Sequence, residues 1–211
     1  MNVKAFGTFE SLESYIFRTN AYLQFGNSTK HIGLIIMLNP GSSCLADDDQ
    51  WDDFLSKSKM VKNISISNEL KLDSTMKSVV ELLLNSDPTL EGRLTILNLF
   101  NIRCGNSNKA IQTYTTLLKK AKFNILLHSP LPNLTQYPWI WTAWSVKDAT
   151  ILNSRKIEFL EEIPKNKKIA LYSRQKIHQT KKELYCYHPC PQKETTRKWV
   201  QSEMIKQLKT V

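Results

Sequence analysis

The stretch Ile32-Gly33-Leu34-Ile35-Ile36-Met37-Leu38-Asn39-Pro40-Gly41-Ser42-Ser43 decides the fold class of this chain. Its first seven residues form an unbroken apolar run, which is typical of a central strand covered on both faces. Polar and turn-forming residues follow at once, so the strand ends in a loop. Ligand sites in open α/β sheets lie at the carboxyl ends of such strands. The stretch therefore predicts a buried strand with a candidate binding loop at its end.

A second loop of the same kind lies near the other end of the chain. His188-Pro189-Cys190-Pro191 directly follows the strand-like run Leu184-Tyr185-Cys186-Tyr187. If the two loops face one cleft, they bring together an amide and an imidazole. That pair of groups suits chemistry on a nucleobase.

The remaining pattern alternates between strands and helices. Apolar runs predict further strands at 94–100, 124–128, 139–144 and 168–172, and helical spacing predicts helices from Asp73 to Asp87, at 109–121, at 148–163 and at 192–208. The segment 9–25 fits either a helix or a pair of edge strands. We expect a single α/β domain over residues 1–211, built as a three-layer α/β/α sandwich with a mostly parallel central sheet.

Charge favours a polyanionic partner. The chain has 211 residues, with 29 Lys and Arg against 19 Asp and Glu, a net charge of +10. The positive charge gathers at 165–168, 174–182 and 193–209, which fits a phosphate-gripping face, although solvated helix surfaces explain it equally well. No run of 18 apolar residues and no basic, apolar leader is present, so we expect a cytoplasmic protein without a membrane partner.

Cysteine and carboxylate spacing gives little sign of a metal. Cys44, Cys104, Cys186 and Cys190 are scattered and form no CxxC pair. We therefore expect reduced thiols, no metal and no cofactor. The acidic group at 47–49 fits a solvated loop, with a general base or an ion ligand as the alternative.

Several motifs resemble those of the uracil-DNA glycosylase superfamily. Leu38-Asn39-Pro40-Gly41 is similar to the first catalytic loop of its mismatch-specific and thymine-excising branches, and His188-Pro189-Cys190-Pro191 to its second motif. Ile96-Leu97-Asn98 with Arg103-Cys104-Gly105 resembles a strand-end Asn and Arg-Ala-Gly, and Trp141-Thr142-Ala143-Trp144-Ser145 resembles a strand that ends in Trp-Gly. Ser145 in place of Gly is a departure from that pattern.

The chain is still more similar to an uncharacterised bacterial domain family. Its hallmarks are an Asn-Pro-Ser-type loop, an acidic stretch, an Asn-Leu-Phe-x-x-Arg strand end and a late His-Pro. Here these correspond to residues 37–43, 47–49, 98–103 and 188–189, within a resemblance that runs from about 31 to 192.

The resemblance implies a uracil-DNA glycosylase-like fold and a monofunctional DNA N-glycosylase. Hydrolysis of an N-glycosidic bond passes through an oxocarbenium-like sugar and leaves negative charge on the base. His188 would donate a hydrogen bond to the base oxygen, and Asn39 would hold the water. An amide is a poor base, so the reaction would be slow or selective for a base that leaves easily. No lysine lies in either loop to form a Schiff base.

The other candidate site residues surround this pair. Asn98 would read the base edge, with Asn101 as the competing choice, and either one fits a structural amide as well. Arg103 would bind phosphate or tie down its loop, and Trp51 would stack on a base or pack under its loop. The base- or substrate-binding set is Pro40, Gly41, Ser42, Asn98, Asn101, Asp48 and Trp51, and the nucleic-acid-binding set is Ser43, Arg103, Gln192, Lys193, Arg197 and Lys198.

We expect this protein to act as a monomer on DNA. A modified or mismatched base would be flipped from the strand and excised, in repair or in phage defence. Gln192 and Lys193 replace the usual apolar wedge, which argues against ordinary repair of uracil in duplexes. Two alternatives stay open: a non-catalytic module that binds nucleic acid or nucleotides, and a hydrolase of free nucleosides or nucleotides.

Overall fold

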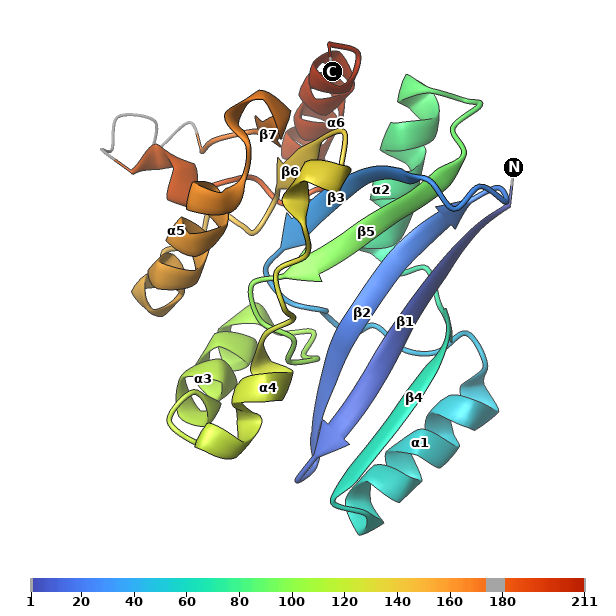
Figure 1. Cartoon of the computed structure of the whole chain (residues 1–211), viewed down its shortest axis with the longest axis vertical. Coiled ribbons are helices and arrows are strands. Elements are labelled where there is room, and N and C mark those ends of the chain that lie inside the picture. Colours follow the sequence, from blue (N-terminus) through green and yellow to red (C-terminus); the bar gives the residue numbers. More distant parts are fainter. Residues whose placement is uncertain (1, 174–180, 211) are drawn as a thin grey trace.

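The computed structural model of this chain describes residues 2–173 and 181–210. It is an α/β structure around a seven-stranded mixed sheet with the strand order β4-β1-β2-β5-β3-β6-β7 (Figure 1). The strands are β1 (Val3–Leu12), β2 (Tyr15–Phe25), β3 (His31–Met37), β4 (Asn63–Leu70), β5 (Gly92–Asn98), β6 (Ile140–Thr142) and β7 (Lys168–Ala170). The α-helices are α1 (Asp48–Met60), α2 (Ser74–Ser86), α3 (Ser107–Leu117), α4 (Asn124–Leu127), α5 (Asn153–Glu162) and α6 (Glu194–Leu208). Short 3₁₀ helices lie at Ala121–Phe123, Leu134–Gln136, Thr150–Leu152, Lys165–Lys167 and Lys182–Leu184.

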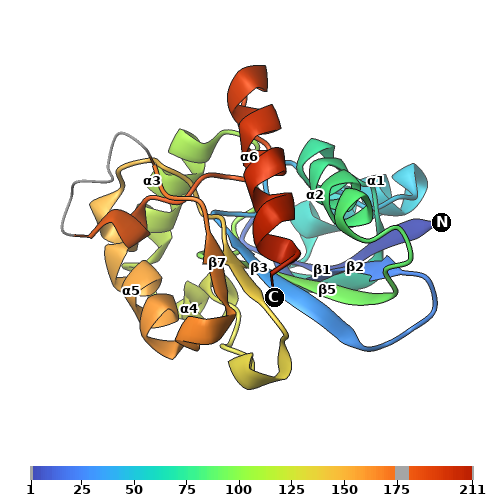
Figure 2. The same ribbon diagram turned by 90° about the horizontal axis from the view of Figure 1, so that it is seen from above.

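Helices cover both faces of the sheet because its central strands are apolar on both sides. In β3, Ile35 and Met37 join one core cluster with residues of α1, α2 and α6. Leu34 and Ile36 join the other cluster, with residues of α3, α4 and α5. Figure 2 shows these two groups of helices on opposite sides of the strands. The unbroken apolar run at 32–38 is thus explained by burial on both faces.

The sheet is only partly parallel, which corrects the expectation of a mostly parallel one. β5, β3, β6 and β7 run parallel to one another, whereas β4, β1, β2 and β5 pair antiparallel. The antiparallel part follows from the β1–β2 hairpin, whose two turn residues Glu13 and Ser14 have φ angles of 50° and 68°. A two-residue turn with both φ angles positive forces the flanking strands antiparallel. Glu and Ser are unusual in such a turn, so the hairpin could not be predicted from its turn residues.

Most predicted elements are present, with four differences. The segment 9–25 belongs to the β1–β2 hairpin, which lies inside the sheet because β4 pairs with the outer side of β1. The predicted strand at 124–128 is wrong, since Asn124–Leu127 is the helical turn α4. In the predicted strand at 184–187 only single bridges form, from Cys186 to Ser145 and to Tyr172. The edge strand β4 was not predicted at all.

Helix boundaries agree well with the sequence signals. α2 begins after Asp73, whose carboxylate accepts a hydrogen bond from the Met76 N–H at 2.8 Å, and it ends before Asp87. An N-cap side chain typically accepts a hydrogen bond from the backbone N–H of the residue three positions further along the chain. α6 buries Val200 and Met204 in the core cluster that it shares with α2.

Candidate functional site

The carboxyl end of the parallel strands carries the candidate site. From β3 the chain reaches β5 on one side of β3 and later β6 on the other, so the loops after these strands diverge and leave a crevice. A cavity of about 570 Å³ opens there. Its walls come from the Asn39 loop, the loop before α3, the Ser145–Lys147 segment, the start of α2 and the His188 loop. Two loops 149 positions apart, at Asn39 and His188, therefore meet in one cavity.

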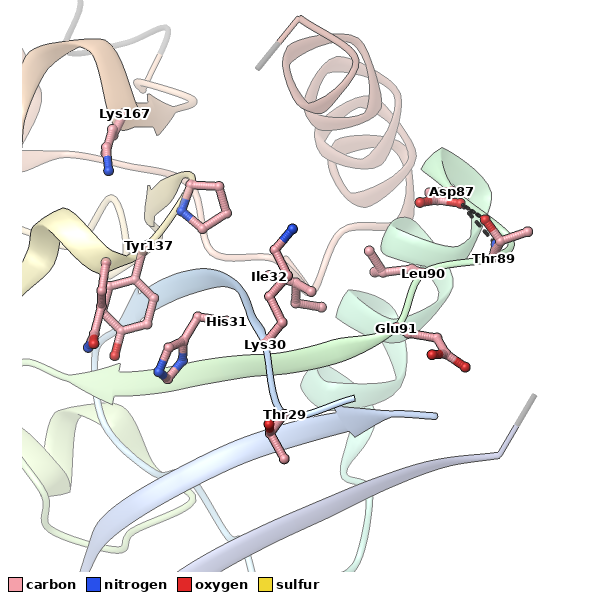
Figure 3. A pocket seen from close by; sticks show the side chains of 12 residues that line it. Thr29, Lys30, His31, Ile32, Asp87, Thr89, Leu90, Glu91, Tyr137 and Lys167 are labelled. Carbon is pink, nitrogen blue, oxygen red and sulfur yellow. Dashed lines mark hydrogen bonds between the residues drawn. The ribbon is translucent and has the colours of Figure 1, made fainter. Parts of the chain in front are cut away.

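A second cavity, of about 740 Å³, lies at the opposite, amino ends of the parallel strands (Figure 3). It is lined by residues that precede or begin the parallel strands, such as His31, Glu91, Tyr137 and Lys167. Figure 3 shows these side chains spread around a broad opening. Ligand sites in open α/β sheets lie at the carboxyl ends of strands, so we take the smaller cavity as the candidate site.

Asn39 joins two loops of the site. Its Nδ2 donates to the carbonyl oxygen of Cys104 at 2.9 Å and to that of Ile102 at 3.3 Å. Both amide hydrogens are thus used to hold the loop after β5. The Oδ1 atom accepts no hydrogen bond from the described residues, so it is the part of the amide left to hold a ligand or a water.

The rest of the Asn39 loop presents backbone to the cavity. Pro40, Gly41 and Ser42 line it, and Gly41 has a φ of 66° with no atom within 4 Å of the position a Cβ would take. Ser43 is buried beneath them, and its Oγ has no hydrogen-bond partner among the described residues. This loop therefore leaves open space where a ligand can approach the main chain.

Arg103 ties this loop down. Its Nε donates to the carbonyl oxygen of Ser43, its Nη2 donates to that of Ser42 at 3.1 Å, and its guanidinium lies 4.8 Å from the ring centroid of Trp51. Burial lowers the pKa of Arg103, with partial compensation by nearby thiols. Two roles were expected for Arg103, phosphate binding or anchoring of its loop, and these contacts correspond to anchoring of the loop.

Trp51 and Asp48 lie away from the cavity. Trp51 is 7% exposed and packs against Phe9 and Phe54 in the core, so its ring is not open for stacking on a base. Asp48 is in the first turn of α1, exposed, and pairs with Lys71. Asp48 faces solvent at the start of α1, whereas Trp51 packs into the core and reaches the Asn39 loop indirectly, through the guanidinium of Arg103.

The two candidate base readers are both buried. Asn101 donates from Nδ2 to Leu126 at 3.0 Å and accepts from Ser129 at 3.2 Å, so it is a structural loop amide. Asn98 is 2% exposed and pairs in register with Met37, which lines the cavity, but Asn98 itself is not in the lining. Its Oδ1 has no partner among the described residues.

His188 lies in the cavity wall as a neutral ring. Burial lowers its pKa below the ordinary value, and the backbone of Cys190 and the charge of Asp73 offset only part of that effect. Its Nδ1 lies 3.2 Å from the Cys190 nitrogen and 3.3 Å from the Cys190 oxygen. A backbone N–H always carries its hydrogen, so a neutral ring that accepts from it holds its own proton on Nε2.

A fully buried arginine at the cavity was missed in the sequence. Arg18 of β2 lines the cavity and is 1% exposed, and its Nε and Nη2 have no hydrogen-bond partner among the described residues. Burial lowers the pKa of Arg18 to about 10, against the opposing effect of Asp73. A buried cation without hydrogen bonds is costly to the fold, so its presence points to a use.

A β-bulge explains why Arg18 faces inward. Gly7 pairs with Ala21 and Phe9 pairs with Arg18, so β2 has one residue more than β1 in this interval. The extra residue reverses the alternation of side chains. Arg18 therefore shares a face with Phe9 and the apolar core, although the sequence groups it with polar residues such as Asn20.

Two further charged groups at the cavity were not predicted as site residues. Asp73 lines it while capping α2, and its charge raises the pKa values of both Arg18 and His188. Lys147 stands exposed at the rim and donates to Ser107 and to Asn108. The cavity lining thus combines a cation, a carboxylate and a neutral imidazole.

The predicted nucleic-acid contacts lie around the start of α6. Gln192 lines the cavity mouth and is exposed, and Lys193 is exposed at the N-cap position of α6. Lys198 pairs with Glu194 at 2.8 Å, and Arg197 is partly buried on the same helix. Of the basic stretch at 174–182, residues 174–180 lie outside the described residues.

Metal-binding and membrane-spanning features were also searched for. In the described part of the chain, no three His, Cys, Asp or Glu side chains are grouped so that they could hold a metal ion. Among the same residues, no helix has the length and apolar character needed to cross a bilayer.

The fold and the cavity together define an α/β protein with a candidate ligand site at the carboxyl ends of its parallel strands. Comparison with family models, curated proteins and solved structures gave no match.

Proposed function

We propose that this protein is a monofunctional N-glycosylase with a uracil-DNA glycosylase-like fold, which removes a modified or mismatched base from DNA. One observation carries the proposal: the Asn39 loop and the His188 loop, far apart in sequence, line the same cavity of about 570 Å³. That volume is in the range of small-ligand sites. The three-layer arrangement and the resemblance in motif order agree with this assignment.

In the proposed reaction His188 stabilises the leaving base. The ring is neutral, and with Nδ1 accepting from the Cys190 N–H it presents Nε2–H to the cavity. A preset donor aimed at the base oxygen becomes more favourable as negative charge develops there. Burial strengthens that interaction because little water competes.

Asn39 orients the water. Its Nδ2 is held by two backbone carbonyls, so the side chain is fixed and Oδ1 is free to accept a hydrogen bond from water. An amide positions water but does not deprotonate it well. A Schiff-base route has little support, since Lys147, the lysine in the cavity lining, has its Nζ engaged by Ser107 and Asn108.

A panel of oligonucleotides with modified bases and mismatches, single- and double-stranded, tests the proposal. Abasic sites are scored after alkaline cleavage, for wild type, Asn39→Ala and His188→Ala. His128→Ala is the matched control, because His128 is also a partly buried histidine but contacts Tyr114 outside the cavity. We expect product with wild type and with His128→Ala, and a loss of about 100-fold or more in the two cavity variants.

Two results would overturn the proposal. Equal product from wild type, Asn39→Ala and His188→Ala would remove both residues from the reaction. Cleavage of mononucleotides without any cleavage of DNA would assign the site to a hydrolase of free nucleotides. Activity on DNA should fall steeply with salt, because phosphate contacts release counterions.

A further inference from the structure

The lining of the cavity includes two opposite charges that the proposed reaction leaves unused, and one of them, Arg18, is fully buried. The Nε and Nη2 atoms of Arg18 lack partners among the described residues. Asp73 lines the same cavity, and its electrostatic effect reaches both Arg18 and His188. Neither residue belongs to the motifs from which the function was inferred.

Arg18 reaches this position only through a local irregularity of the sheet. The bulge in β2, opposite Thr8, turns Arg18 from the polar side of the strand to the inner side. Gly7 makes room for the bulged backbone, since a Cβ at residue 7 would lie 2.8 Å from the carbonyl oxygen of Asn20. Bulges commonly re-aim a side chain next to a functional site.

We propose that Arg18 and Asp73 form the base-recognition end of the cavity, where Arg18 donates to a carbonyl oxygen of the target base and Asp73 accepts from a neighbouring N–H or amino group. This inference deepens the proposed function and rests on it. A guanidinium is only a donor, and an ionised carboxylate is only an acceptor. The pair therefore fits a base that carries both a carbonyl and an N–H or amino group, as derivatives of guanine, cytosine and uracil do, and it disfavours adenine, which has no carbonyl.

The charge balance favours a base over a phosphate at this end. Arg18 and Asp73 offset each other and His188 is neutral, so the inner end carries about zero net charge. A phosphate dianion would gain from Arg18 but would be repelled by Asp73. Two exposed lysines lie nearby: Lys147 is part of the lining and Lys193 directly follows Gln192 of the lining, so the phosphates of a strand would pass there.

The same arrangement assists bond cleavage. When the bond between the sugar C1′ and the base nitrogen breaks, its electron pair stays on the base. The water oxygen then bonds to C1′, and the proton that it releases balances the charge of the departing base. Arg18 lies where it stabilises that negative charge together with the Nε2–H of His188.

Binding of free nucleosides tests the subsite without requiring catalysis. Guanosine, cytidine, uridine and adenosine are titrated calorimetrically into wild type, Arg18→Met, Arg18→Lys and Asp73→Asn, with inorganic phosphate as a separate arm. Asp73→Asn keeps an N-cap acceptor for α2 but adds an amino donor. Asp47→Asn is the matched control, because Asp47 caps α1 in the same way outside the cavity.

We expect one or more of guanosine, cytidine and uridine to bind more tightly than adenosine. Arg18→Met and Asp73→Asn should each weaken that binding about ten- to a hundredfold, and Asp47→Asn should leave it unchanged. If Arg18→Met does not fold, Arg18→Lys decides the role of Arg18, since a single ammonium loses the paired donors. Unchanged nucleoside binding in Arg18→Lys and Asp73→Asn overturns the subsite, and so does phosphate binding that depends on Arg18 without any nucleoside binding.

The outcomes separate this inference from the proposed function. If wild type cleaves DNA and the Arg18 and Asp73 variants cleave it equally well, the glycosylase assignment stands and the subsite fails. If wild type cleaves nothing but binds nucleosides through Arg18 and Asp73, the subsite stands in a binding module.

Discussion

Replacing Arg18 with methionine is expected to make the ligand-free protein harder to unfold. Arg18 is buried with two nitrogen atoms that lack partners among the described residues, and burial lowers its pKa to about 10. That change corresponds to roughly 3 kcal/mol of unfavourable free energy for the charged form in the folded state. Methionine keeps an apolar chain of similar length without a charge. We expect Arg18→Met to raise the free energy of unfolding by about 1–3 kcal/mol.

Urea unfolding at pH 7, followed by tryptophan fluorescence in the absence of nucleotides, measures this change. Lys156→Met is the comparison, because Lys156 is equally buried but its Nζ donates to the Leu184 carbonyl at 2.9 Å. Removing that hydrogen-bonded cation should not stabilise the protein. A loss of more than about 1 kcal/mol in Arg18→Met would show that the guanidinium supports the fold, and the reasoning about an unused charge would be refuted.

Three further predictions concern the walls of the cavity and its pH response. Asn39→Asp should lower stability by about 2–4 kcal/mol, because a carboxylate replaces two donor hydrogens that face backbone carbonyls; unchanged urea stability would contradict this. Gly7→Ala should cost about 1–3 kcal/mol, because its Cβ would lie 2.8 Å from the Asn20 carbonyl oxygen; a neutral effect on the urea midpoint would count against a tightly packed bulge. Burial lowers the pKa values of His128 and His188 below 6.5, so the unfolded chain binds more protons as the pH falls below about 6.5. Stability is therefore full above that pH and should decline below it, by up to about 1.4 kcal/mol per pH unit for each ring, and His188→Gln should reduce the slope in urea titrations at pH 5 to 7.

The parts of the fold set by local pattern were predictable from the sequence. The run at 32–38 is unbroken because β3 is covered on both faces, and Asp73 has the side chain and spacing of an N-cap. The turn at Glu13 and Ser14 was not predictable, because neither residue favours a positive φ. The segment 9–25 was therefore predicted as either a helix or a pair of edge strands. For the same reason the sheet was predicted to be mostly parallel.

The candidate site was predictable where it lies on strand-end loops and not where it depends on sheet register. Asn39 and His188 were expected to face one cavity, and both line it. Trp51 was considered for stacking because its neighbours are polar, but helix packing turns its ring into the core. Arg18 was not predicted as a site residue, because a single extra residue in β2 reverses which side chains are buried.

The side chains around this cavity come from residue 18 at one extreme and the stretch 187–192 at the other, with contributions from four stretches in between. Nearly the whole polypeptide must therefore be synthesised and in place before the chamber exists. A guest that binds inside it would stabilise only the completed molecule. Ligand binding in the cavity would then indicate that folding of the whole chain is complete, and a fragment from either half of the chain would not bind the ligand.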